Sequence, residues 1–396
     1  MLWWISFFNY ADRQAIFSVF PLLESEMGLT LKERGYLGTS FAVVYGVSAL
    51  FAGMVVDRVR RKTAILGGLQ VWSLICMTTA VSRNYIQLLL FRAAEGLGET
   101  FYYPASTSLL SDYHGPATRS RALGLHQTSV YIGTIAGGFL AGFIALHYGW
   151  RGSFVFFGGL GMVLGVILQF TLLEPPRGAA EDGNQPARKR LPLGETIFII
   201  LRTPAVPFFM LAFACSNYAA MVLLSWMPQY LSSKFNLRLD WAGLGATGPP
   251  QLASMLGAPL GGWLADVWRS RRASGRAQVQ ALAVFACAPF VYLCGHTESL
   301  PWFFFFLASW GFFKGFYDAN IFAAVFDVVP PEARGTVAGF MNTFGWLLGG
   351  AAAPTVVGWL GDEYGLGPAI GTSAAVYLAA GCLLLVASRF LTGRKK

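Results

Sequence analysis

Seven charged residues lie inside long apolar stretches of this chain: Asp12, Arg13, Arg92, Glu95, Glu99, Lys314 and Asp318. A charge at the centre of a membrane-spanning helix costs at least about 2.5 to 3.5 kcal/mol, so it must be compensated or useful. A guanidinium presents a fixed fork of donors that fits a carboxylate or phosphate, and a buried carboxyl group can take up and release a proton. These residue types could therefore bind an anion and carry a proton.

Three of these charges share one face of a predicted helix. Arg92 and Glu99 are seven residues apart, which makes them nearly eclipsed and about 10 Å apart along the helix axis, and Glu95 lies on a neighbouring line between them. We expect this face to point into a helix bundle and away from lipid.

The functional interpretation is that Arg13 and Arg92 hold an anionic group while Asp12 or Glu99 carries protons. The alternative is a static network of ion pairs that fixes helix packing. Glu95 either pairs with Arg92 and weakens the anion clamp, or is a second protonation site.

Lys314 and Asp318 are four residues apart, a spacing typical of an intrahelical ion pair. If Asp318 instead reaches across to the first half of the chain, it joins the candidate proton-coupling residues and Lys314 becomes a third cation for the substrate.

The composition of the chain indicates which kind of structure positions these charged groups. Of 396 residues, 55% are hydrophobic and 12% are charged, which indicates a protein with lipid as its solvent. Apolar runs predict twelve spanning helices, at about 2–23, 35–56, 63–81, 85–110, 122–147, 152–173, 205–231, 242–265, 278–294, 302–329, 336–361 and 368–391. The first run has no basic leader and is interrupted by Asp12, so it predicts a spanning helix and no cleaved signal peptide.

Several function classes are excluded by what the sequence lacks. The five cysteines lie in apolar runs without metal-ligand spacing, and no P-loop, H-E-x-x-H motif, nucleophile elbow or dinucleotide fingerprint is present. We therefore expect no enzyme, no catalytic residues, no cofactor and no metal.

The basic residues are distributed unevenly between the predicted loops. With both termini inside, the cytoplasmic segments carry twenty Lys and Arg residues and the outer loops carry six. This bias predicts a multi-pass protein of a bacterial inner membrane with both termini cytoplasmic, and it accounts for the net charge of +9 without nucleic acid.

The chain shows an internal repeat. A motif at 53–62 (GMVVDRVRRK) follows the second span, and a similar one at 262–272 (GWLADVWRSRR) follows the eighth; likewise HYGW at 147–150 corresponds to EYGL at 363–366. A hydrophilic stretch separates the halves. We predict two pseudo-symmetric six-helix bundles, at 1–173 and 204–396, joined by a cytoplasmic linker at 174–203.

At these residues the chain resembles the major facilitator superfamily, whose loop motif is close to G-x-x-x-D-R-x-x-R-R/K. The resemblance implies an all-α membrane fold with twelve helices, and a loop that latches the cytoplasmic face. The gating residues are Gly53, Asp57, Arg58, Arg61, Asp266 and Arg269. The alternative is that the basic residues of this loop only anchor the topology.

Within that superfamily, two groups resemble this chain. The pairing of NYADR at 9–13 with RAAEGLGE at 92–99 resembles organic anion:cation symporters and also spinster-type lipid transporters. GWRGSF at 149–154 and Asn217-Tyr218 favour the anion symporters, whereas GLGE at 96–99 and VPPEAR at 329–334 favour the spinsters. Glu95 departs from the family pattern, in which that position is usually apolar.

The resemblance also implies a polar lining for the substrate at the midplane between the halves. The matching residues are Tyr10, Tyr45, Asn217, Tyr218 and Asn342, with His126 and Gln127 on a stripe of the fifth span. Polar groups in spanning helices also serve packing alone, and for each residue that alternative stays open.

The sequence thus predicts a monomeric secondary transporter. It would couple protons to the symport of a small organic anion by rocking of its two halves. The alternatives are a spinster-like carrier of lysolipid or sphingolipid amphiphiles, and a non-transporting receptor, against which the buried charge argues.

Overall fold

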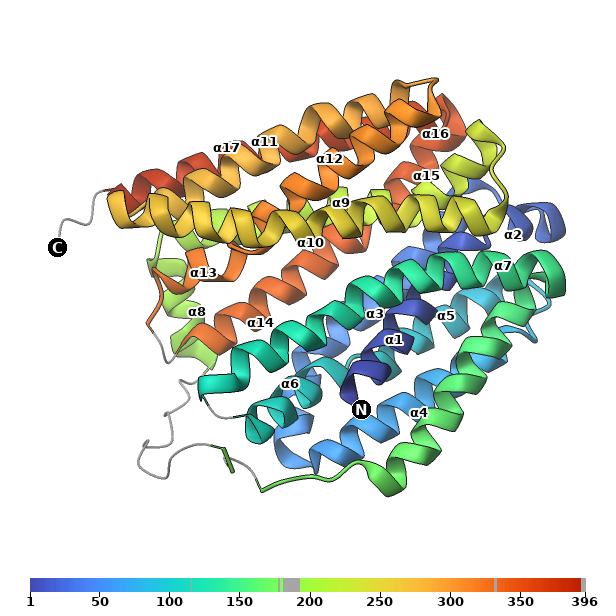
Figure 1. Ribbon diagram of the computed structural model, residues 1–396, viewed down its shortest axis with the longest axis horizontal. Helices are drawn as coiled ribbons and strands as arrows, with labels where there is room; N and C mark the ends of the chain where they lie inside the picture. Colours follow the sequence, from blue (N-terminus) through green and yellow to red (C-terminus); the bar gives the residue numbers. More distant parts are fainter. Residues whose placement is uncertain (115, 177–178, 181–192, 331–332, 393–396) are drawn as a thin grey trace. The chain divides into compact units, whose positions relative to one another are not determined.

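The computed structural model describes residues 1–396 except 115, 177–178, 181–192, 331–332 and 393–396, and every regular element among the described residues is a helix (Figure 1). In chain order the helices are α1 Leu2–Ser18, α2 Phe20–Met27, α3 Leu31–Arg58, α4 Arg61–Thr79, α5 Tyr85–Glu99, α6 Tyr102–Tyr113, α7 Pro116–Thr171, α8 Leu193–Arg202, α9 Ala205–Phe235, α10 Leu239–Arg271, α11 Gly275–His296, α12 Leu300–Asp318, α13 Ile321–Phe326, α14 Arg334–Phe344, α15 Ala352–Tyr364, α16 Leu366–Gly371 and α17 Ser373–Thr392. A π-helical turn, Gly345–Gly350, joins α14 to α15.

Two predicted spans are interrupted near a proline. The first breaks at Val19, between α1 and α2, and the second breaks after Glu99, between α5 and α6. Pro21 and Pro104 lack the amide hydrogen that would continue the helical bonds of the preceding turn. Each break therefore ends a helix just beyond a group of charged residues, Asp12 and Arg13 in α1 and Glu95 and Glu99 in α5.

The internal repeat is visible in the backbone. Gly149 lies inside α7 with φ 73° and ψ 166°, and Gly365 lies between α15 and α16 with φ 84° and ψ 152°. This conformation suits glycine, which has no Cβ atom. The same backbone conformation, which would strain any other residue, thus recurs at Gly149 and Gly365, the two positions that correspond in the sequence repeat.

Among the described residues, five helical stretches are long and apolar enough to cross a membrane. They are Arg121–Thr171, Ala205–Phe235, Gly275–His296, Thr336–Tyr364 and Leu366–Leu391.

The chain forms two compact units. The first comprises Met1–Ala187 with Met227–Thr247, and the second comprises Arg188–Trp226 with Gly248–Lys396. In the second unit, α11 packs against α12 and α17. In the first unit, α1 packs along α7, and α4 packs against α5 and α7 (Figure 1).

Small residues set the spacing of the helices in the first unit. A Cβ atom on Gly133 of α7 would lie 3.1 Å from the Cα atom of Phe7 in α1, and one on Gly96 of α5 would lie 2.7 Å from the carbonyl oxygen of Phe41 in α3. A Cβ atom on Gly98 of α5 would lie 3.0 Å from the Cβ atom of Trp72 in α4. Because larger side chains would push these backbones apart, the glycines allow α1 to pack closely on α7, and α5 on α3 and α4.

Candidate functional site

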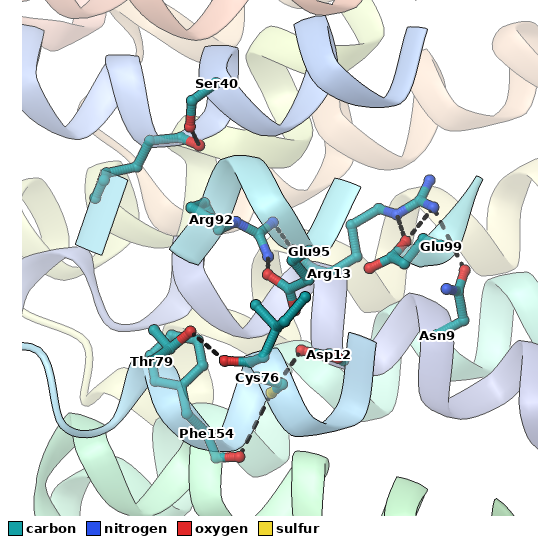
Figure 2. Close-up of polar contacts among 12 residues, drawn as sticks. Asn9, Asp12, Arg13, Ser40, Cys76, Thr79, Arg92, Glu95, Glu99 and Phe154 are labelled. Atoms are coloured by element: carbon teal, nitrogen blue, oxygen red, sulfur yellow. Dashed lines mark hydrogen bonds and ion pairs between the residues drawn. The ribbon is translucent and has the colours of Figure 1, made fainter. Parts of the chain in front are cut away.

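A cluster of ionisable side chains lies in the interior of the first unit (Figure 2). α1 contributes Asp12 and Arg13, and α5 contributes Arg92, Glu95 and Glu99. Arg13 is 9% exposed and the other four are at most 2% exposed. We call these five residues the charge cluster. Charges this deep are tolerated only when they are paired and hydrogen-bonded.

Arg13 and Glu99 form an ion pair between α1 and α5. The Nε atom of Arg13 donates to Oε2 of Glu99 over 3.0 Å, and its Nη2 atom donates to the same oxygen and to Oδ1 of Asn9. The rings of Tyr10 and Tyr45 lie 4.8 and 4.9 Å from the guanidinium carbon. Arg13 is therefore held by one carboxylate and by aromatic faces that favour a cation.

Arg92 and Glu95 form a second ion pair, within α5, and both side chains are fully buried. Nη2 of Arg92 also donates to the carbonyl oxygen of Arg13 over 3.2 Å. The ring of Phe41, from α3, lies 4.7 Å from the guanidinium carbon of Arg92 and 4.9 Å from that of Arg13. Phe41 thus contacts both cations, and sequence reasoning missed it because an aromatic residue in an apolar run carries no distinguishing signal.

Asp12 has different neighbours from the other acids. Its Oδ1 atom accepts a hydrogen bond from the thiol of Cys76 in α4 over 3.0 Å, and it forms no ion pair among the described residues. The same thiol lies 3.4 Å from the carbonyl oxygen of Phe154 in α7. Ligand atoms of Asp12, Cys76 and Glu95 all lie within 4.8 Å of one another, so two acids and a thiol gather here.

The predicted orientation of α5 is confirmed. Arg92, Glu95 and Glu99 are buried, whereas Leu90 and Leu97 are 62% and 49% exposed on the same helix. The hydrophobic side chains that would face lipid are thus opposite the charges. Of the two interpretations of Glu95, the structure shows the ion pair with Arg92, and the second, protonation, stays a prediction.

The other predicted residues of the first unit separate into two places. Tyr10 and Tyr45 lie beside Arg13, as described above. His126 is hydrogen-bonded to the hydroxyl group of Tyr102 over 2.8 Å, and that hydroxyl also donates to the carbonyl oxygen of Leu2. The partner of His126 is therefore Tyr102 of α6, which in turn bonds to the start of α1, and Gln127 beside His126 is exposed.

In the second unit, Lys314 and Asp318 form the predicted intrahelical ion pair and are 18% and 34% exposed. Asn217 and Tyr218 of α9 and Asn342 of α14 are half-buried. A Cβ atom on Gly345 would lie 3.2 Å from the side-chain nitrogen of Asn217, so α9 packs closely on the π-helical turn.

Arg61 of the predicted gating motif is 1% exposed and forms ion pairs with Asp112 and Glu174. The backbone N–H groups of Arg61 and Lys62, at the start of α4, donate to the carboxylate of Glu174 over 2.8 and 3.4 Å. Arg58 is exposed, the side chain of Asp57 lies outside the described residues, and Gly53 has no side chain. The motif therefore fastens the end of α7 to α4 and α6 within the first unit.

The second unit repeats this arrangement. Asp266 pairs with Arg276 over 2.6 Å, and Asp327 pairs with both Arg269 and Arg276 over 3.1 and 3.0 Å. Arg276 lies near the start of α11 as Arg61 does at the start of α4. Sequence reasoning named Asp266 and Arg269 but missed Arg276, Asp327, Asp112 and Glu174, because they lie outside the motif and are brought to it by the fold.

We predict that Glu174→Ala lowers the free energy of unfolding by about 1 to 2 kcal/mol, because the backbone N–H groups at the start of α4 lose their carboxylate acceptor. Burial raises the pKa of Glu174, but hydrogen bonds from the backbone and side chain of Arg61 outweigh it, so the pKa lies below the ordinary value of 4.5. The contribution is therefore fully present above about pH 4.5 and is lost as the pH falls through the lowered value. Melting temperatures of both proteins should converge in acid.

The exposed Glu363 at the end of α15 provides a matched control, since Glu363→Ala removes an acid without such contacts. A variant at Glu174 that melts like Glu363→Ala at neutral pH would contradict the capping role.

A family model described as "Major Facilitator Superfamily" matches residues 2–354. Among curated proteins, the chain is 25% identical to a "Hexuronate transporter" of Bacillus subtilis over 387 residues, which are 96% of this chain and 90% of that protein. It is also 25% identical to a "D-galactonate transporter" of Escherichia coli over 392 residues, with 93% and 90% coverage.

Two solved structures share the fold. A bacterial homolog of the human lysosomal transporter Spinster, in an inward-facing and unoccupied conformation, superposes with a TM-score of 0.88 at 20% identity, covering 98% of this chain and 96% of that one. The occupied, inward-facing conformation gives 0.80 at 21% identity, with 98% and 94% coverage.

Proposed function

The chain belongs to the major facilitator superfamily, whose members are multi-pass membrane transporters and not enzymes, and we propose that it is a proton-coupled symporter of a small organic anion. The observation that carries this proposal is the charge cluster. Two buried guanidinium groups are each neutralised by a carboxylate that a substrate carboxylate could replace.

The exchange of counter-ions provides the coupling. An anion that approaches Arg13 competes with Glu99 for the guanidinium donors. Once displaced, Glu99 is a carboxylate in a buried position without its cation, and protonation removes that penalty. Binding of the anion therefore favours uptake of a proton, and release of the proton restores the Arg13–Glu99 pair. Asp12, Glu95 and Asp318 are further candidates for carrying protons.

Tyr10 and Tyr45 lie beside Arg13 and would orient a hydroxylated substrate. Asn217, Tyr218 and Asn342 of the second unit stay candidates for further contacts with the substrate. This arrangement requires twelve spans in two six-helix bundles, 1–173 and 204–396, that alternate access to a midplane site. We propose a monomer in a bacterial inner membrane, with both termini and the 174–203 linker cytoplasmic, in which the Arg61 and Arg276 ion pairs stabilise the cytoplasmic ends.

Ligand-induced thermal stabilisation tests the substrate class. We expect hexuronates or galactonates to raise the melting temperature of the purified protein, by an amount equivalent to about 2.7 kcal/mol at a hundredfold excess over Kd. Neutral sugars of the same size are the matched ligands, because they lack the carboxylate that Arg13 and Arg92 would bind. Stabilisation by the neutral sugar alone would contradict the anion clamp.

A second candidate is transport of lysolipid or sphingolipid amphiphiles, which the backbone similarity to the Spinster homologs favours. A lysophospholipid carries a phosphate group that a guanidinium could bind. Stabilisation by a lysophospholipid, without any by sugar acids, would replace the first candidate with the second.

A further inference from the structure

The charge cluster has one negative charge too many. Two guanidinium groups face three carboxyl groups, and both guanidinium groups already have partners, Arg13 with Glu99 and Arg92 with Glu95. The carboxyl group left over is that of Asp12, which is 2% exposed. An uncompensated buried carboxylate costs several kcal/mol, so a further cation is required.

The geometry indicates where that cation belongs. Glu95 uses Oε2 for Arg92, while its Oε1 atom is buried and has no hydrogen-bond partner among the described residues. Oxygen atoms of Glu95 and Asp12 lie within 4.8 Å of each other, and Figure 2 shows the two side chains approaching from α5 and α1. A buried acceptor without a donor, near a second carboxyl group, is an arrangement that the binding of one proton by the pair relieves.

Among the residues that the structure describes, no other group around Asp12 supplies a positive charge. α5 presents Glu95 and Glu99 to it, and α4 presents the Cys76 thiol. From α7 the described contact is the carbonyl oxygen of Phe154, and the tyrosine that α3 contributes contacts Arg13. Arg13 itself is directed to Glu99.

We propose that Asp12 and Glu95 hold a single bound proton between them in the resting protein. Two carboxylates this close in a dry interior cannot both be ionised, so the first proton belongs to the pair. The thiol ligand disfavours sodium, since hard cations take oxygen ligands. Arg92, which is bonded to Glu95, opposes a divalent metal by charge repulsion.

The acids of the cluster then have different roles, and this assignment of roles rests on the proposed function. Glu99 is the counter-ion that the substrate displaces, whereas Asp12 and Glu95 store a proton before the substrate arrives. Because position 95 supplies the extra acid, this chain carries one proton more than a cluster with an apolar residue there.

Infrared spectroscopy tests the pair without any substrate. A protonated carboxylic acid has a carbonyl stretching band apart from the amide bands, and a maltoside detergent adds no ester carbonyl to that region. We expect the band in the wild-type protein at neutral pH and in Cys76→Ser, and its complete loss in both Glu95→Gln and Asp12→Asn, because either change leaves two cations and two carboxylates. Asp240→Asn is the control, since Asp240 is a buried acid bonded to Arg238, over 2.8 Å, outside the cluster.

Three outcomes would overturn the proposal. One is the absence of the band from the wild-type protein, a reading that does not depend on whether the variants fold. Another is its persistence in Glu95→Gln or Asp12→Asn. The third is thermal stabilisation by sodium over potassium that Glu95→Gln abolishes, which would make the bound cation a sodium ion. A failure of anion transport would leave the band unchanged, so the two proposals fail separately.

Discussion

Replacing Arg92 with alanine is expected to abolish anion uptake and to lower stability at the same time. Loss of a charged hydrogen-bonding partner for the substrate removes about 3 kcal/mol of binding energy, which is about a hundredfold in affinity. The same change leaves Glu95 buried without its cation, and breaking a buried ion pair costs about 3 to 5 kcal/mol of stability. Uptake into proteoliposomes and the melting temperature report the two effects.

The double variant Arg92→Leu/Glu95→Leu separates them. Replacing both partners of a buried pair with apolar groups of similar size is often neutral for stability, so the melting temperature should recover. Binding of the sugar acid should stay lost, because no guanidinium is left at that position. If the double variant binds and transports like the wild-type protein, the Arg92–Glu95 pair serves packing alone.

A matched variant on α1 tests the geometry of the clamp. Arg13→Lys keeps the positive charge near Glu99 but replaces the fork of donors with a single ammonium group. Wild-type affinity in this variant would show that charge alone, without the fork, binds the anion.

The helices and the burial of the charges could be predicted from the sequence because both follow from periodicity. Arg92, Glu95 and Glu99 share a face by spacing alone, and the cost of charge in lipid requires that face to point inward. The breaks after Ser18 and Glu99 were harder to predict from the sequence. Proline is tolerated in many spanning helices, and whether a helix breaks near it depends on the helices packed around it.

Which acid pairs with which arginine could not be predicted in the same way. The sequence left Glu95 either as a partner of Arg92 or as a protonation site. The structure shows the ion pair with Arg92, while Arg13 of α1 pairs with Glu99. Cys76 and Phe41 could not be recognised as site residues, because the packing of α4 and α3 on α5, close at Gly98 and Gly96, is a property of the fold. Glu174 became part of the Arg61 ion pairs for a similar reason, as the end of α7 returns to α4.

The second large effect concerns Glu99, which the substrate is proposed to displace. Glutamine at this position keeps an oxygen acceptor for Arg13 but cannot bind a proton. We expect Glu99→Gln to exchange labelled for unlabelled anion across the membrane, while accumulation driven by a pH gradient is lost. Equal accumulation by the variant and the wild-type protein would show that Glu99 carries no transported proton.

Proton entry that accompanies anion entry is the most direct test of coupling at the charge cluster. Proteoliposomes containing the wild-type protein and an internal pH indicator receive a hexuronate or galactonate outside, without any imposed gradient. The account predicts that the interior acidifies as the anion enters, and that Glu99→Gln abolishes the acidification. Entry of the anion with no change of internal pH would contradict it.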